Sequence, residues 1–337
     1  MVARHLIVVA ALAAVMVSGG ANAAVTFGSC PFDLVGWSSG GCSSPAGEMI
    51  NVTVPLTTPA RWVIFSTHTH DVNQKGDIYI NGNAATGDYV GSFLALSATK
   101  TTTQVWDLGQ FTNTVTFANI TNALVVGARD PYSRIGHSQF FAKDPGVNLA
   151  AGATTTGVVN ALGVTATAIG TGANPHGMFD GLDCADNGFG VPIWRANPNL
   201  DTNFVGVTFD GVVTVDALRV SLTDGLGGHR WLNFDVQVQY TVGGGWDTIG
   251  RADTVVGEGK TLWTDVNGVD TRYLWIDLGG MEIAGVRLFG SDATGNNPKA
   301  NDGLFLVELQ VWSGAIPEPV TMSLLALGGL ALLRRRK

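Results

Sequence analysis

The stretch Ala217–Ala252, which reads ALRVSLTDGLGGHRWLNFDVQVQYTVGGGWDTIGRA, decides the fold class of this chain. It contains an apolar run, a polar loop, a second run in which apolar and polar residues alternate, a glycine-rich turn, and a third run that opens with Ile249-Gly250. Alternation with a period of two is typical of a β-strand with one buried face. The stretch therefore predicts three strands joined by turns.

An earlier stretch, Arg61–Phe93, has the same order of elements. Asp77–Ile80 aligns with Asp235–Val238 at an offset of 158 residues, and Val90-Gly91 aligns with Ile249-Gly250 at an offset of 159. Solenoid repeats are shorter, with periods of about 20 to 50 residues. A repeat of this length instead predicts two tandem β-sandwiches of ordinary size.

Each copy also ends on a closing strand, and Gln139–Phe141 aligns there with Glu308–Gln310. Between the two ends of the chain there is no long amphipathic helical pattern, whereas turn-forming glycine is abundant, with 45 residues. Short β-branched and aromatic runs alternate with Gly, Asn, Asp and Pro. We expect an all-β body, and we expect Trp246, Trp275 and Trp312 in its core because of their strand context.

The charge of the body limits its partners. The whole sequence has a formal net charge of −8, but without its two ends it has 14 Lys and Arg against 26 Asp and Glu, a net charge of −12. Such a chain repels nucleic acid and anionic membranes, so no nucleic-acid partner is expected. We also find no nucleophile elbow, phosphate-binding loop or carboxylate pair in a recognisable frame, so no enzymatic activity is expected.

The N-terminal segment has the three parts of a secretory signal. A basic start at Arg4 precedes the apolar run Leu6–Val17, and Ala21-Asn22-Ala23 supplies a small-x-small cleavage site. This predicts a signal helix over residues 1–23 and an exported mature chain that begins at Ala24.

The last residues, Ile316–Lys337, combine Pro317, Glu318 and Pro319 with an apolar run and a terminal basic cluster. The uncharged part, Val320–Leu333, has 14 residues, about 21 Å as a helix, against a bilayer core of ~30 Å. The tail resembles the PEP-CTERM sorting signal. That resemblance implies a short transmembrane helix in the inner membrane of a bacterium, cleavage by an exosortase-type protease near Pro317-Glu318-Pro319, and release or attachment at the cell surface.

The body resembles the discoidin or galactose-binding-like jelly rolls, a superfamily rich in carbohydrate-binding modules. The second copy carries most of the family pattern, and the first is shorter and more diverged. The matching segments of the second copy are Phe179-Asp180-Gly181, Val207–Asp210, Val215–Val220, Phe234–Gly250 and Gly303–Val311. The resemblance implies two tandem jelly-roll β-sandwiches, over residues 24–146 and 147–314, between the signal helix and the sorting tail over residues 315–337.

Three cysteines occur, at positions 30, 42 and 184. Cys30 and Cys42 bracket a turn-rich segment, and in an exported protein they are expected to form a disulfide, with Cys184 left over. The alternative is three unpaired apolar side chains.

Ligand contacts are expected in loops at one end of a sandwich, where rings and planar donors occur together. His68 and His70 lie one residue apart and point the same way on an extended segment, which suits a sugar contact, a metal ligand or a polar loop without a role. The other candidate contacts, each of which is alternatively a core or surface residue, are Tyr132, Arg134, Trp194, Arg195, His229, Arg230 and Trp231.

The segment Phe179–Gly188 has aspartates at every third position among turn residues. Ca²⁺ prefers six to eight oxygen ligands of this kind. The resemblance implies a structural Ca²⁺ held by Asp180, Asp183 and the acid of the closing strand, Glu308. The alternative is a solvated acidic turn.

Taken together, the sequence predicts an exported cell-surface or extracellular-matrix protein that binds extracellular polysaccharide without catalysis. The alternative is a structural surface or matrix protein that contacts other proteins.

Overall fold

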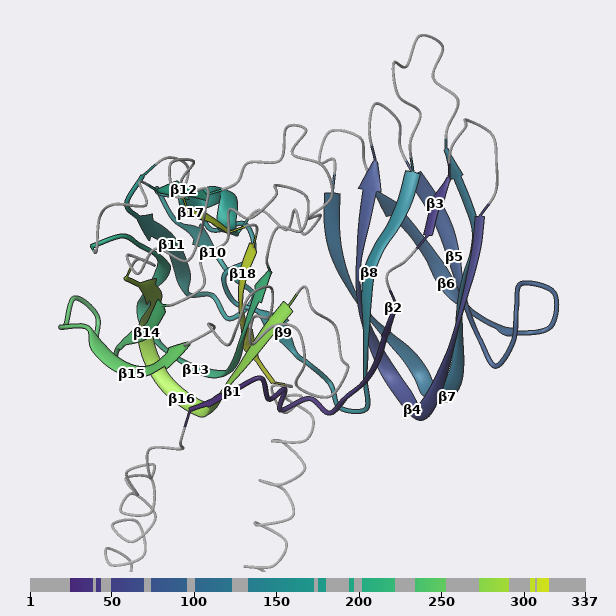
Figure 1. Ribbon diagram of the computed structural model, residues 1–337, viewed down its shortest axis with the longest axis horizontal. Coiled ribbons are helices and arrows are strands. Elements are labelled where there is room, and N and C mark those ends of the chain that lie inside the picture. The colour runs from purple at the N-terminus through teal and green to yellow at the C-terminus, as the bar shows by residue number, and fades with distance from the viewer. Residues whose placement is uncertain are drawn as a thin grey trace, which may run out of the picture.

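The structure is a computed structural model in which two β-rich modules lie side by side (Figure 1). The described residues are 25–38, 41–43, 50–69, 74–95, 101–122, 133–172, 175–179, 194–196, 202–221, 234–252, 273–290, 304–306 and 308–314.

The first module is a seven-stranded antiparallel sheet with the order β2-β8-β4-β7-β5-β6, and β3 pairs with β8. Its strands are β2 (Leu34–Ser38), β3 (Gly41–Ser43), β4 (Ile50–Thr69), β5 (Gln74–Ile80), β6 (Asp88–Ala95), β7 (Thr101–Asn122) and β8 (Ser133–Phe141). The two long strands, β4 and β7, fold the sheet into two layers. The inner layer contains β2, β8 and the second half of β4, and the outer layer contains β5, β6 and the second half of β7.

Local chemistry produces the bend between these layers. The β4–β7 register shifts between Pro55 and Trp62, where proline interrupts regular pairing because it has no N–H to donate. On β7, Gly109 adopts φ 78°, a conformation that favours glycine, and its N–H donates to Asp107 Oδ1 at 2.8 Å. Phe65 of the inner layer then meets Phe93 and Phe117 of the outer layer, with ring centroids 5.2 and 4.9 Å away.

The second module is a nine-stranded sheet that is folded in the same way around β13 and β16. Its outer layer has the order β10-β11-β13-β16-β14-β15, and its inner layer joins β9, β18 and β1 to the remaining halves of β13 and β16. The strands are β1 (Thr26–Phe27), β9 (Val147–Asn148), β10 (Val158–Val159), β11 (Thr165–Gly170), β13 (Phe204–Ser221), β14 (Phe234–Gln239), β15 (Asp247–Ala252), β16 (Tyr273–Phe289) and β18 (Glu308–Ser313). A separate pair, β12 (Trp194–Ala196) with β17 (Leu304–Leu306), and the short helix η2 (Pro175–Met178) complete the described elements.

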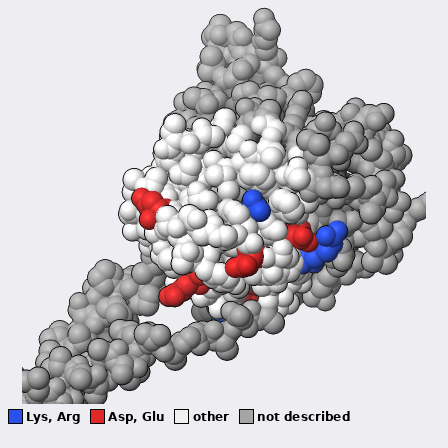
Figure 2. Space-filling view, turned by 90° about the vertical axis from the view of Figure 1, so that its left-hand side faces the viewer, with Lys and Arg blue, Asp and Glu red and all other residues white. Residues whose placement is uncertain are grey.

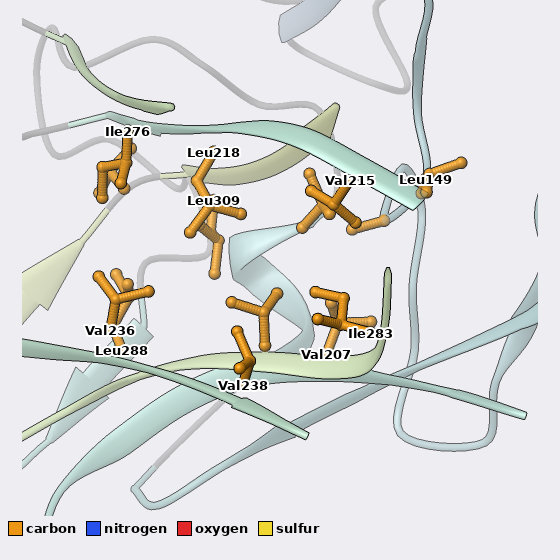
Figure 3. Packing of buried hydrophobic residues seen from close by; sticks show 14 of the residues in the cluster. Leu149, Val207, Val215, Leu218, Val236, Val238, Ile276, Ile283, Leu288 and Leu309 are labelled. Carbon is orange, nitrogen blue, oxygen red and sulfur yellow. The ribbon is translucent and has the colours of Figure 1, made fainter. Parts of the chain in front are cut away.

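Side chains from the two layers of this module meet in one apolar core (Figure 3). Leu218, Ile276 and Leu309 come from the inner layer, and they point toward Val236 and Leu288 of the outer layer. All five are buried, so alternation along each strand sends the intervening residues to the opposite face.

The two modules have equivalent strands, β4 with β13, β5 with β14, β6 with β15, β7 with β16 and β8 with β18. The pairing of Trp62 with Asp107 corresponds to that of Ala217 with Asp277. Each aspartate accepts a hydrogen bond at 2.8 Å from the N–H of the glycine two residues further on. The repeat seen in the sequence is therefore a repeat of strand order, and each copy is an all-β sandwich.

The inner layers of the two modules pack against each other. Phe32, Ile64 and Phe141 from the first module form a buried cluster with Ala217, Trp275 and Trp312 from the second. We call this set the inter-module cluster. Trp275 and Trp312 are buried as expected, but they lie between the modules and not inside a single sandwich.

A buried arginine crosses this contact. Arg219 Nε donates to Gln139 Oε1 of the first module at 2.8 Å, and its Nη1 donates to Gln310 Oε1 of the second module at 2.9 Å. The guanidinium also lies 3.6 Å from the ring centroid of Tyr273. Charge-assisted hydrogen bonds of this kind are stronger than neutral ones, so they fix how the modules sit on each other.

The first module does not begin where the sequence predicted. The first module was expected to begin at Ala24, but Thr26 and Phe27 pair with Asp277 and Ile276 of β16 and therefore join the second module. Between the modules, β8 ends at Phe141 and β9 begins at Val147.

The predicted signal segment and the predicted sorting tail, including Pro317, Glu318 and Pro319, lie outside the described residues. Within the described ranges, no helix is long and apolar enough to cross a membrane.

Candidate functional site

The contacts expected from the sequence fall mostly where the structure gives no side chains. His70, Tyr132, His229, Arg230 and Trp231 lie outside the described residues. The remaining four, His68, Arg134, Trp194 and Arg195, are described only by their backbone.

The backbone nevertheless corrects one expectation. His68 and Arg134 were expected in loops, but they lie in β4 and β8 and are directly paired across them. Trp194 and Arg195 were also expected in a loop, and they lie in β12, paired with Leu306 and Phe305. Pairing satisfies the backbone hydrogen-bonding groups of these polar segments, which explains why the strands continue through them.

Of the expected Ca²⁺ ligands, only Glu308 is described. It lies at the start of β18, fully buried, on the strand face shared with Gln310 and Trp312. Phe179, which precedes Asp180, packs in the core against the other face of that strand. Asp180 and Asp183 lie outside the described residues, so the Ca²⁺ site stays a prediction.

The expected disulfide between Cys30 and Cys42 is wrong, because Cys30 is a free thiol. Cys30 packs against the inter-module cluster, which contains Phe141 at one end of β8. Cys42 pairs with Arg134 of β8, which lies seven residues before Phe141. At ~3.3 Å per residue along a strand, Arg134 and Phe141 are about 23 Å apart. A disulfide needs Cα atoms within about 7 Å. Desolvation raises the pKa of the Cys30 thiol from 9.0 to about 12.

A polar and aromatic cluster lies on the exposed side of the first module's outer layer. Ile78 and Ile80 point into the core, so Asp77 and Tyr79 between them point outward. The neighbouring strands add Tyr89 and Ser92 from β6 and Asn119 from β7. We call the set of Asp77, Tyr79, Tyr89, Ser92 and Asn119 the tyrosine–aspartate face.

Hydrogen bonds fix the carboxylate of this face. Ser92 Oγ donates to Asp77 Oδ1 at 2.5 Å, and Asn119 Nδ2 donates to Asp77 Oδ2 at 2.7 Å. The Tyr89 hydroxyl lies 2.7 Å from Ser92 Oγ and, because the Ser92 proton points to Asp77, it is the donor there. The rings of Tyr79 and Tyr89 meet edge to face, with centroids 5.5 Å apart.

Asn119 reaches Asp77 because β7 carries a bulge at this point. Lys75 pairs with Thr121 but Asp77 pairs with Ala118, so β7 has an extra residue. Asn119 adopts φ 53°, a left-handed conformation that asparagine tolerates better than most residues. Its backbone N–H donates to Asn51 Oδ1 of β4 at 3.0 Å. Bulges redirect side chains in this way and are frequent at sheet edges and beside active sites.

The face is open to solvent and suited to binding. Tyr89 is 59% exposed, so its ring can stack on an apolar surface. Each carboxylate oxygen of Asp77 accepts one hydrogen bond within the protein and has a further lone pair for a ligand hydroxyl. In the ranges that the structure describes, no three His, Cys, Asp or Glu side chains are grouped closely enough to hold a metal.

Among known proteins, only solved structures are similar to this chain. No family model matches the sequence, and no curated protein matches it. A fucose-binding module of Streptococcus pneumoniae is 14% identical and covers 50% of this chain and 99% of its own, with a TM-score of 0.36.

Two further structures extend over more of the chain. A fucolectin from striped bass serum is 12% identical, with 82% of this chain and 86% of the lectin covered and a TM-score of 0.32. An allantoicase is 12% identical, with 80% of each chain covered and a TM-score of 0.30. These identities are low and the TM-scores lie below 0.5, so nothing about the ligand of this chain follows from them.

Sequence reasoning did not identify the tyrosine–aspartate face. Asp77–Ile80 marked the repeat, and its alternation of Asp and Tyr with Ile already indicates one polar, aromatic face. Ser92 and Asn119 come from other strands, and only the pairing across β6, β5 and β7 brings them to Asp77.

Proposed function

We propose that this protein binds carbohydrate, without catalysis, through the tyrosine–aspartate face. The observation that carries the proposal is the exposed Tyr89 ring beside a carboxylate that Ser92 and Asn119 hold in place. A sugar ring has an apolar face that stacks on an aromatic ring, and it has hydroxyl groups at its edge that need fixed acceptors and donors.

A fixed carboxylate lowers the cost of binding, because Asp77 loses little side-chain freedom when a sugar hydroxyl donates to it. The face lies on a sheet and is open, so a ligand keeps much of its contact with water. We therefore expect affinities in the micromolar to millimolar range, roughly 4 to 8 kcal/mol. Longer polysaccharides gain from repeated contacts along the chain.

The terminal segments of the sequence support an extracellular setting for this activity. A signal segment over residues 1–23 exports the chain, and the PEP-CTERM-like tail holds it at the inner membrane until an exosortase-type protease cleaves near Pro317-Glu318-Pro319. The ligand is then a polysaccharide of the cell surface or the extracellular matrix.

A glycan array that includes polysaccharide from the source bacterium tests this function. The purified protein should bind at least one glycan, and Tyr89→Ala should lose most of that binding. Phe111→Ala is the matched control, since Phe111 is 58% exposed on the same module. It lies outside the tyrosine–aspartate face, because it precedes Thr116, the partner of Tyr79 on β7, by five residues. If the protein binds no glycan but self-associates, the alternative of a structural matrix protein is correct.

A further inference from the structure

The second module presents an equivalent outer face with a different set of side chains. The strands β14, β15 and β16 occupy the places of β5, β6 and β7. Asp77 pairs with Ser92 in the first module, and at the equivalent position in the second module Asp235 pairs with Arg251. In the same way, Tyr79 pairs with Thr116 in the first module and Gln237 pairs with Arg287 in the second. The position that is occupied by a neutral Thr116 in the first module is thus occupied by a cation in the second.

Arg287 is surrounded by aromatic rings. Its guanidinium carbon lies 4.4 Å from the ring centroid of Trp246, 4.8 Å from that of Phe289 and 4.9 Å from that of Phe204. Its Nε donates to Gln237 Oε1 at 2.8 Å. We call these five residues the arginine–aromatic cluster. Trp246, which was expected in the core, is half-buried on this outer face.

The neighbouring residues hold the cluster in place. Gln237 Nε2 donates to Thr248 Oγ1 at 3.0 Å, which orients the amide oxygen toward Arg287. Gly285 leaves room for the indole, because a Cβ there would lie 3.2 Å from Trp246. The guanidinium is therefore pre-oriented, and little conformational freedom is left to lose on binding.

The charge of Arg287 is not balanced within the described part of the chain. No carboxylate among these residues forms an ion pair with it, and Asp235 on the same face pairs with Arg251 at 3.1 Å. Its Nη groups have no protein acceptor among the described residues, and Arg287 is only partly buried, so these donors are open to a ligand. Burial lowers the pKa of Arg287, with no acidic neighbour to oppose the effect, yet the group stays charged at neutral pH.

A half-buried cation costs free energy that a bound anion recovers. The parallel Nη donors match the two oxygens of a carboxylate. Figure 2 shows the side of the molecule on which β14 and β15 lie, where the described surface is mostly uncharged and acidic and basic groups are scattered over it. The net negative charge of the chain does not prevent the approach, because salt at physiological strength screens exposed charges beyond about 8 Å.

We propose that the arginine–aromatic cluster is a second binding site, which recognises the carboxylate groups of an acidic polysaccharide. This inference rests on the proposed carbohydrate binding but uses a different module and a different chemistry. The first module then contacts sugar hydroxyls and the second contacts uronate carboxylates, so one chain can engage two kinds of residue in a matrix.

The proposal is tested by comparing two binding affinities of the full chain. One is for polygalacturonate, and the other is for the same polymer after its carboxyl groups have been reduced. The acidic polymer should bind about tenfold more tightly, as one charge-assisted bidentate contact suggests. Arg287→Gln should abolish this preference, and Arg287→Lys should keep part of it, since it keeps the charge but not the two parallel donors. Arg251→Gln, on the same face, should keep all of it.

Equal binding of both polymers by the unaltered protein would overturn the proposal and leave the proposed function standing. Binding of neither polymer, together with an empty glycan array, would remove both. A preference that survives in a folded Arg287→Gln variant would place the carboxylate elsewhere. Displacement of polygalacturonate by acetate at the same carboxylate concentration would show that the site takes small carboxylates and not a polysaccharide.

Discussion

Truncation of Trp312 should separate the two modules. Trp312 is 1% exposed, lies in the inter-module cluster, and donates from Nε1 to Gln310 Oε1 at 3.2 Å. Replacement of a buried Trp by Ala costs about 3 to 5 kcal/mol. Trp312 lies on the face of β18 that points away from the second module's own core and toward the first module. Most of this cost therefore falls on the contact between the modules and little on either core.

Differential scanning calorimetry measures this effect. The unaltered protein should unfold in one transition, because Arg219 and the inter-module cluster couple the modules. Trp312→Ala should split it into two, with the first lowered by roughly 10 °C at about 2 to 4 °C per kcal/mol. The control is Leu309→Ala, which removes a buried residue of the same strand on the side of the module core.

Leu309→Ala should lower the melting temperature while the single transition remains. If Trp312→Ala also gives one shifted transition, the two modules do not unfold as separate units and the account of their contact is wrong. If Trp312→Ala leaves the melting temperature unchanged, the cluster contributes no stability in solution.

Three further results are expected. Asn119→Ala should be less stable than Asn119→Gly by about 1 kcal/mol in urea unfolding, because alanine is strained at φ 53°; the reverse order would exclude the bulge. Native Cys30 should resist alkylation by iodoacetamide at pH 8, as measured by peptide mass spectrometry; alkylation as fast as in urea would contradict this. Because the pKa of Cys30 rises from 9.0 in the unfolded chain to about 12 in the folded protein, its contribution to the stability of the fold should be full below pH 9 and decline above it. If Asp180, Asp183 and Glu308 hold Ca²⁺, EDTA should lower the melting temperature; an unchanged melt removes the site.

The all-β class and the repeat could be predicted because they depend on local alternation. Asp77–Ile80 and Asp235–Val238 alternate with a period of two, and both are strands at equivalent places in their modules. The sequence indicates the contact between the modules less clearly than it indicates the repeat. The runs Trp62–Phe65 and Tyr273–Ile276 are apolar or aromatic at every position, which is what burial on both faces requires.

The binding faces depend on pairing between strands that are distant in sequence. Asn119 lies 42 residues from Asp77, and only the bulge on β7 brings its amide to the carboxylate. Arg287 lies 50 residues from Gln237 in the same way. The disulfide prediction failed for the same reason, because nearness in sequence between Cys30 and Cys42 says little about distance once β2 and β3 extend along β8.

Chemical modification of Tyr89 tests the central claim most directly. Tetranitromethane should nitrate the exposed Tyr89, and a neutral polysaccharide that binds on the array should slow this reaction in proportion to its occupancy. Tyr240, 38% exposed on the second module, is the internal control and should react at an unchanged rate. If the polysaccharide is bound while Tyr89 is nitrated as fast as in the free protein, the tyrosine–aspartate face is not the binding site.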